Sequence, residues 1–185
     1  MLLAMILMVS VLWLFEKSSP YPTERRFNKL QFVSSSLYSL GHGGNDAQKT
    51  MGIITVLLVA NGFQQGFEVQ FWVIISCHIA MALGTLFGGW RIVRTMGMGI
   101  TRIRPSGAFS AQTSGAIALF LATYLGIPVS TTHTITGAII GVGISRRASA
   151  VRWGLASRIV WAWVLTIPCA GLIAAAAYHF GKTFL

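Results

Sequence analysis

Apolar runs alternate with short polar segments from one end of the chain to the other. The longer runs cover residues 2–15, 30–60, 71–90 and 153–180, and two shorter pieces cover 109–124 and 129–142. A membrane-spanning helix needs roughly 20 apolar residues, and the runs recur more often than the core of a soluble domain would need. The pattern predicts an all-α, polytopic membrane protein with about four transmembrane helices plus a helical hairpin.

The two shorter pieces are expected to form this hairpin over residues 109–143. They contain about 16 and 14 residues, so as helices they reach roughly 21–24 Å, which is marginal for a full span. A re-entrant pair that meets near the membrane midplane fits this length. A pair of tilted full spans is the alternative, and it would give the same charge pattern.

The apolar runs divide the chain into two units. Residues 1–29 comprise a first transmembrane helix and a cytoplasmic loop, in which Pro20 and Pro22 indicate irregular backbone. This helix lacks the basic start and the cleavage site of a signal peptide, and because it is short we expect it to be truncated. Residues 30–185 comprise an interrupted helix 30–60, the span 71–90, the hairpin 109–143 and a final span 153–180, interrupted by Pro168.

Charge fixes an expected orientation. Only 10% of the residues are charged, against about 25% in soluble domains, and the net charge is +10. Twelve of the fourteen Lys and Arg residues lie in three connections, 16–29, 91–105 and 145–158. If the hairpin returns to its starting side, these connections share one membrane face, which the positive-inside rule makes cytoplasmic. Both chain ends are then extracytoplasmic, and nucleic-acid binding is not expected, because no polar or aromatic binding face accompanies the arginines.

The motif GHGGNDAQKTMG places glycines and polar side chains inside an apolar run. We expect the glycines to break the helix, because irregular backbone at membrane depth is tolerated where it lines a cavity. Asp46 is the acidic residue placed inside an apolar run, which makes it a functional candidate. It either forms a structural ion pair with Lys49 or, with Asn45 and freed backbone carbonyls beside Gly44, binds a coupling Na⁺ or H⁺.

The motif GIPVSTTHTITG predicts a helix N-terminus just after its proline. Such an end offers unpaired N–H groups and a partial positive charge, which suit an anion. Ser130, Thr131 and Thr132 add hydroxyl donors without fixed charge, and they either bind an anion or only cap the helix. His133 either has a functional role, in which it orients a hydroxyl or takes up a proton, or is a buried structural residue. Gln112 on the first arm is expected to face the same cavity.

Together the two motifs resemble the inorganic phosphate transporter (PiT) family. GHGGNDAQKTMG resembles its Asn-Asp signature, and FSAQTSGAIALFLATYLGIPVSTTHTITGAIIGVG resembles its hairpin. The likeness is to the C-terminal repeat of bacterial low-affinity phosphate transporters, and it implies two inverted repeats, each with a broken helix and a re-entrant hairpin, of which this chain holds one. It implies that Asn45 and Asp46 bind the coupling cation and approach phosphate, and that Ser130, Thr131 and Thr132 bind phosphate. We expect Gln112 to bind phosphate with them, and Gly44, Lys49 and His133 to support the site. The pair Gln48-Lys49 departs from the family pattern, which often has small or amide residues there, and Lys49 places a fixed charge near Asp46.

The resemblance implies ion-coupled phosphate symport, with the lipid bilayer, H⁺ or Na⁺ and an N-terminal repeat as partners. Because the first repeat is missing, the alternative is an inactive fragment or a non-transporting membrane interaction protein. A homodimer would need antiparallel subunits, which the one-sided basic charge disfavours. An enzyme with its own cofactor or metal is not expected, because the sequence contains no nucleophile–base set, metal-ligand cluster or P-loop.

Overall fold

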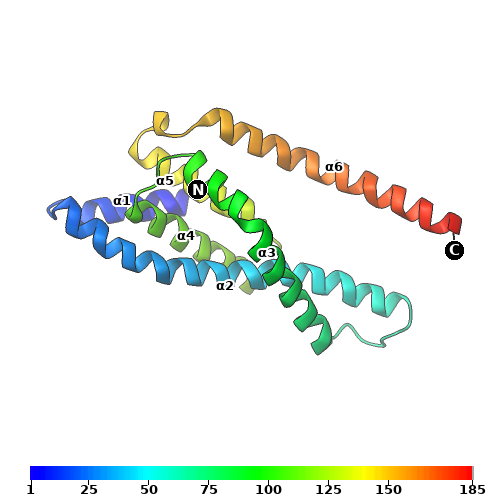
Figure 1. The fold of residues 1–185 in the computed structure, drawn as a ribbon. Helices are drawn as coiled ribbons and strands as arrows, with labels where there is room; N and C mark the ends of the chain where they lie inside the picture. Colours follow the sequence, from blue (N-terminus) through cyan, green and yellow to red (C-terminus); the bar gives the residue numbers. More distant parts are fainter. Residues whose placement is uncertain (185) are drawn as a thin grey trace.

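The computed structural model describes the backbone of residues 1–184, and their side chains apart from those of residues 91, 92, 183 and 184. The helices are α1 (Leu2–Leu14), α2 (Pro20–Ala60), α3 (Phe71–Gly99), α4 (Pro105–Tyr124), α5 (Thr131–Arg146) and α6 (Trp153–Phe184), with a short 3-10 turn at Ala148–Ala150 (Figure 1). The described part of the chain contains no strand, so the all-α prediction is confirmed.

Helix α2 corrects the break that was expected at the glycine motif. It runs without interruption over 41 residues, or about 60 Å. A glycine inside a helix costs about 0.5–1 kcal/mol relative to alanine, which is too little to break a helix that neighbours support along its length. Gly41 also has a packing role, since a Cβ there would lie 3.3 Å from the Cβ of Leu119 on α4. A Cβ on Gly44 would meet no other described element within 4 Å.

The loop predicted for residues 16–29 is also shorter than expected, because α2 begins at Pro20. A proline at the first helical position loses no hydrogen bond, since the N–H groups of the first turn have no partner within the helix. Pro22 lies in the same turn, so it is accommodated for the same reason. The two prolines therefore begin a helix and do not form a loop.

Among the described residues, two helices are apolar and long enough to cross a membrane, judged by length and composition. They are Phe71–Trp90 within α3, with mean hydropathy 1.8, and Trp153–Lys182 within α6, with mean hydropathy 2.0. Helix α1 is apolar but has 13 residues. Two further predictions are corrected. Helix α3 continues to Gly99, so much of the basic loop expected at 91–105 is helical. Helix α6 passes through Pro168, where an interruption was expected.

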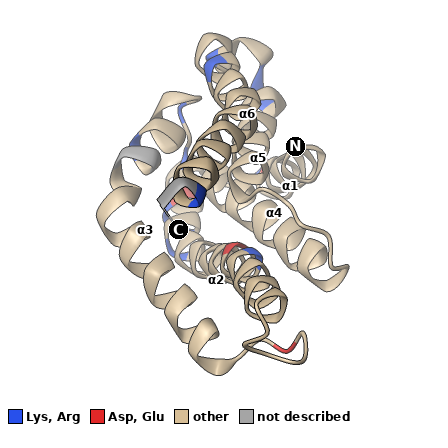
Figure 2. Ribbon diagram, turned by 90° about the vertical axis from the view of Figure 1, so that its right-hand side faces the viewer, with Lys and Arg blue, Asp and Glu red and all other residues tan. Residues whose placement is uncertain are grey.

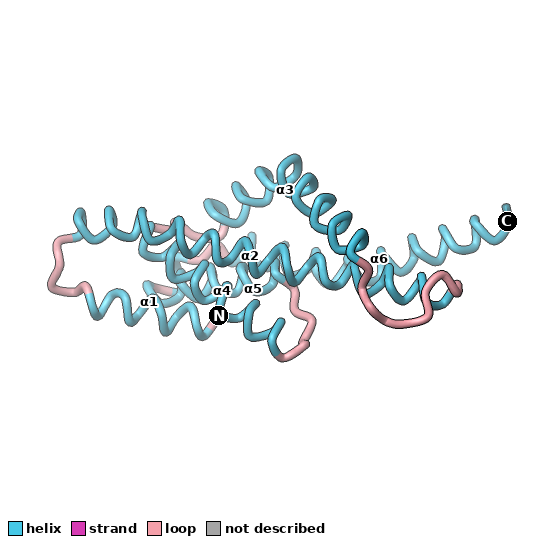
Figure 3. The backbone as a smooth tube through the Cα atoms, turned by 90° about the horizontal axis from the view of Figure 1, so that it is seen from below, coloured by secondary structure: helices cyan, strands magenta, loops and turns pink. Residues whose placement is uncertain are grey.

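Helix α4 lies at the centre of a bundle with α1, α2 and α5, while α3 and α6 extend away from it (Figure 3). Its buried residues are mostly small: Ser106, Gly107, Ser110, Ala111, Ser114, Gly115, Ala116, Leu119 and Ala122. Small residues let neighbouring helices approach closely. Gly115 is in close contact with α2, since a Cβ there would lie 2.8 Å from the ring of Tyr38.

Helices α4 and α5 form the expected hairpin and are joined by residues 125–130. They contain 20 and 16 residues, so both extend beyond the predicted bounds. Hairpin arm α4 runs in the same direction as α2, with its first turn beside Glu24 and the tip beside Asn45. Helix α2 continues about 20 Å beyond Asn45 to Ala60. The hairpin tip therefore lies beside the interior of α2 and not beside its end.

Candidate functional site

The carboxylate of Asp46 is the point where α2 meets the hairpin tip. Its Oδ2 accepts a hydrogen bond from Thr131 Oγ1 at 2.9 Å and lies 3.0 Å from His42 Nε2. Its Oδ1 lies 3.1 Å from Lys49 Nζ and 3.3 Å from Asn45 Nδ2. The two motifs identified in the sequence therefore converge on one carboxylate, although Asp46 and Thr131 are 85 residues apart.

Side chains of α2 also hold the backbone of the tip. The carbonyl oxygen of Val129 accepts hydrogen bonds from Lys49 Nζ at 2.6 Å and from Asn45 Nδ2 at 3.0 Å. The carbonyl oxygen of Thr131 accepts one from the Tyr38 hydroxyl at 3.1 Å. The ion pair between Asp46 and Lys49 is thus present, as one part of a larger network. Because α2 is unbroken, the backbone carbonyl at the acid comes from the hairpin and not from the glycine motif.

The three hydroxyls of the tip have different surroundings. Ser130 caps α5, since its Oγ accepts a hydrogen bond from the backbone N–H of His133 at 3.3 Å. Capping uses a lone pair of this hydroxyl and leaves its hydrogen to be donated elsewhere. Thr131 is buried and donates to Asp46, whereas Thr132 is exposed and lines a cavity.

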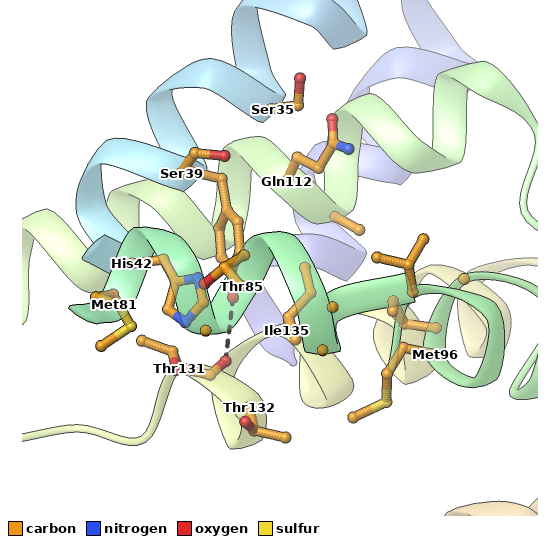
Figure 4. Close-up of a pocket in the computed structure, with 18 of the residues that line it drawn as sticks. Ser35, Ser39, His42, Met81, Thr85, Met96, Gln112, Thr131, Thr132 and Ile135 are labelled. Atoms are coloured by element: carbon orange, nitrogen blue, oxygen red, sulfur yellow. Dashed lines mark hydrogen bonds between the residues drawn. The ribbon is translucent and has the colours of Figure 1, made fainter. Parts of the chain in front are cut away.

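That cavity has a volume of about 1290 Å³ and lies between α2, α3 and the hairpin (Figure 4). Its wall is largely apolar, and the polar groups labelled in the close-up are Ser35, Ser39, His42, Thr85, Gln112, Thr131 and Thr132. An apolar wall with a few converging polar groups is typical of a small-ligand site. Gln112 accepts a hydrogen bond from Ser34 Oγ at 2.7 Å through Oε1, which leaves its amide NH₂ to donate.

The structure separates the predicted site residues into two groups. Gln112, Thr131 and Thr132 line the cavity, whereas Asn45, Asp46, Lys49 and Ser130 are not among the described residues that line it. His133 belongs to neither group, because its exposed ring packs on Trp163 of α6, with ring centroids 3.8 Å apart. It is therefore not the buried residue that one reading of the sequence expected.

Sequence reasoning missed two residues of this site. His42 could have been found, because residues four apart face each other on a helix and His42 precedes Asp46 by four. Tyr38 lies one turn earlier and belongs to no motif. Its role depends on the close approach of α4, which no local pattern reveals.

The base of the hairpin is held by a second carboxylate. Glu24 of α2 accepts hydrogen bonds from the backbone N–H and the hydroxyl of Ser106, at 3.1 and 3.0 Å. Basic residues gather around the turn between α5 and α6 (Figure 2). Burial lowers the pKa of Arg146 there, and Arg104 lowers it further, while Glu24 acts to raise it. Among the described residues, no group of three or more His, Cys, Asp or Glu side chains could hold a metal ion.

Comparison with known proteins identifies the family. The profile described as "Phosphate transporter family" matches residues 2–174. Two relatives, each described as a "probable low-affinity inorganic phosphate transporter", come from Rhizobium meliloti, with 64% identity, and Bacillus subtilis, with 44%. Each of these matches covers 95% of this chain and 53% of the relative, so the chain spans about half the length of these curated relatives.

A solved structure described as "The sodium-dependent phosphate transporter" is also similar. It superimposes with a TM-score of 0.79 at 33% sequence identity, and the match covers 92% of this chain and 44% of that one. The similarity therefore extends over nearly all of the helices described above. The chain belongs to the phosphate transporter family of integral membrane proteins.

Proposed function

We propose that the chain forms one half of an ion-coupled symporter of inorganic phosphate. The observation that carries this proposal is the 2.9 Å hydrogen bond from Thr131 to Asp46, which joins the hydroxyl-rich tip to the half-buried acid. In a symporter, binding of the anion must depend on binding of the cation. Each ligand must therefore change the affinity of the protein for the other, which requires a physical connection between the two sites. A hydrogen bond between them provides the shortest possible connection. The names of the relatives support phosphate as the anion.

In this proposal phosphate binds at the hairpin tip, from the side of the cavity. Its oxygens accept hydrogen bonds from the hydroxyls of Ser130 and Thr132 and from the amide of Gln112. The Thr131 hydroxyl has one hydrogen, which Asp46 accepts in this structure, so Thr131 donates to phosphate when it releases the acid. The first turn of α5 contributes N–H groups and a partial positive charge. None of these donors carries a full charge, which suits an anion that must bind and then leave.

The coupling cation, H⁺ or Na⁺, is proposed to act at Asn45 and Asp46, with the carbonyl oxygen of Val129 as a further ligand. Three residues support this site in different ways. Lys49 balances the charge of Asp46, Gly44 leaves one side of α2 open, and His133 holds the hairpin against α6. No cofactor is included in the proposal beyond the coupling ion.

The proposed arrangement in the membrane places the basic connections in the cytoplasm of a bacterial cell and both ends of the chain outside the inner membrane. A re-entrant hairpin is supported by the position of its tip beside the interior of α2. A second repeat, supplied by an N-terminal half, completes the transporter. A homodimer would need opposite insertion of two chains with the same basic bias.

The competing function is that of a membrane interaction protein or an inactive fragment. Uptake of radioactive phosphate by the complete gene product distinguishes the two. Asp46→Asn and Thr132→Ala are each expected to lower uptake by about tenfold or more, the effect of losing a hydrogen bond to a charged group. The matched controls are Glu16→Gln and Ser36→Ala, which change similar groups away from the site. Normal uptake by both site variants would refute the site assignment, and no uptake by the unaltered protein would refute transport.

A further inference from the structure

Lys49 occupies the place at the acid that a metal cation would take. Its ammonium lies 2.6 Å from the carbonyl oxygen of Val129 and 3.1 Å from Oδ1 of Asp46. A carboxylate and a backbone carbonyl are the oxygen ligands that small hard cations use in transporters. We propose that the Lys49 ammonium is a tethered cation that replaces Na⁺ at Asp46, so that phosphate uptake by this protein does not depend on Na⁺. This inference rests on the proposed function and deepens it.

The hydrogen-bond directions at the acid support this. The amide nitrogen of Asn45 faces two groups that can only accept hydrogen bonds. These are the carbonyl oxygen of Val129 and the carboxylate of Asp46. The amide oxygen of Asn45 is therefore not turned toward the ammonium position. The other contacts of the carboxylate, Thr131 Oγ1 and His42 Nε2, can likewise serve as donors. The acid is surrounded by donors, which complement an ammonium ion, and it lacks the surplus of acceptor oxygens that a bare Na⁺ requires.

The position of Lys49 also differs from that of an ordinary surface ion pair. An exposed pair three residues apart on one helix contributes little to stability, and it needs no partner on another element. Here the same ammonium also bonds the hairpin tip through Val129, which is 80 residues away. A second positive charge would have to share both oxygens with the ammonium at close range. Repulsion between the two cations therefore excludes Na⁺ unless Lys49 moves away.

The experiment removes the tethered charge and measures sodium binding without transport. Lys49→Met keeps the length of the side chain and removes its charge, and Lys49→Gln is a second neutral variant. Lys49→Arg keeps the charge, and Lys29→Met is the matched control near the start of α2. Each complete gene product is purified without phosphate, and its melting temperature is recorded in NaCl and in choline chloride at equal ionic strength.

Sodium is expected to raise the melting temperature of Lys49→Met and Lys49→Gln, and to leave the unaltered protein, Lys49→Arg and Lys29→Met unchanged. The shift should disappear when Asp46→Asn is added to Lys49→Met, which places the ion at that acid. In vesicles, Na⁺ should increase phosphate uptake by the neutral variants by about 5- to 150-fold, the usual range of coupling between two ligands. Uptake by the unaltered protein should be equal in both salts.

A sodium-specific shift in the unaltered protein, or none in either neutral variant, would overturn the inference. If the neutral variants do not fold, the unaltered protein alone decides, because a sodium-specific shift in it contradicts a site filled by Lys49 and its absence supports one. If no variant transports phosphate but the neutral variants still bind Na⁺, the proposed function fails while the tethered cation stands.

Discussion

Gly115 of α4 lies against the ring of Tyr38, and alanine at this position is expected to weaken the attachment of the hairpin to α2. The added Cβ would lie 2.8 Å from Cε2 and 3.0 Å from Cδ2 of the ring. Carbon atoms in favourable contact are about 3.5–4.0 Å apart, so the ring or the helix must move by roughly 0.5–1 Å. The same ring carries the hydroxyl that bonds the carbonyl of Thr131 at the hairpin tip.

The size of the effect follows from two contributions. Overpacking of a close contact costs about 1–3 kcal/mol, and loss of the Tyr38 hydrogen bond costs about 0.5–1.5 kcal/mol. Alanine also stabilises any helix relative to glycine by about 0.5–1 kcal/mol. Gly52→Ala on α2 isolates this last gain, because a Cβ there meets no other described element within 4 Å. The two variants should therefore differ by about 1.5–4.5 kcal/mol.

Thermal unfolding of the complete gene product in detergent tests this difference. For a cooperative unfolding unit of the size of this chain, each kcal/mol shifts the melting temperature by about 2–4 °C, so Gly115→Ala should melt about 3–18 °C below Gly52→Ala. Tyr38→Phe removes the hydroxyl alone and should account for the smaller part of the loss. Melting of Gly115→Ala and Gly52→Ala within about 2 °C of each other would refute the reasoning.

Two further predictions concern the ends of the hairpin. Thr131→Val removes a hydrogen bond to the Asp46 carboxylate and should destabilise the protein by about 1.5–3 kcal/mol, whereas Thr132→Val, at an exposed position, should leave the melting temperature unchanged. Equal stability of these two variants would contradict the assigned bond. Glu24→Ala removes the acceptor at the first turn of α4 and should cost about 1–2 kcal/mol, as loss of a helix cap does. Glu16→Ala is its control. If the melting temperatures of Glu24→Ala and Glu16→Ala fall equally, the hydrogen bonds from Ser106 to Glu24 do not stabilise the hairpin specifically.

The apolar spans and the site motifs could be predicted from the sequence because both depend on local composition. Long apolar runs predicted membrane spans at residues 71–90 and 153–180. The first lies within α3 and the second within α6. The polar residues of the two motifs stood out against apolar surroundings, which made Asp46 and Thr131 recognisable before any contact was known. Their convergence on one carboxylate is a contact between residues far apart in the chain, so neither local composition nor the motifs themselves could predict it.

The continuity of α2 could not be predicted in the same way. Glycine weakens a helix by a small free energy, and whether the helix breaks depends on the neighbours that support it. Gly41 is packed on Leu119 from a helix about 80 residues away, and this contact is invisible to a local pattern. The same holds for Lys49, because its ion pair with Asp46 was foreseeable from spacing but its bond to Val129 was not.

The central position of α4 has a consequence for how the chain enters a membrane. With 20 residues, α4 is long enough to span, yet it does not reach the hydropathy that α3 and α6 reach. A helix of this kind gains little from lipid, and its serines and glycines fit only against other protein. Ribosomes release α1 and α2 first, so these two helices are already in place when α4 leaves the translocation machinery. We therefore expect α4 to dock onto the earlier helices during assembly, and defects in α1 or α2 to appear as failed insertion of the hairpin.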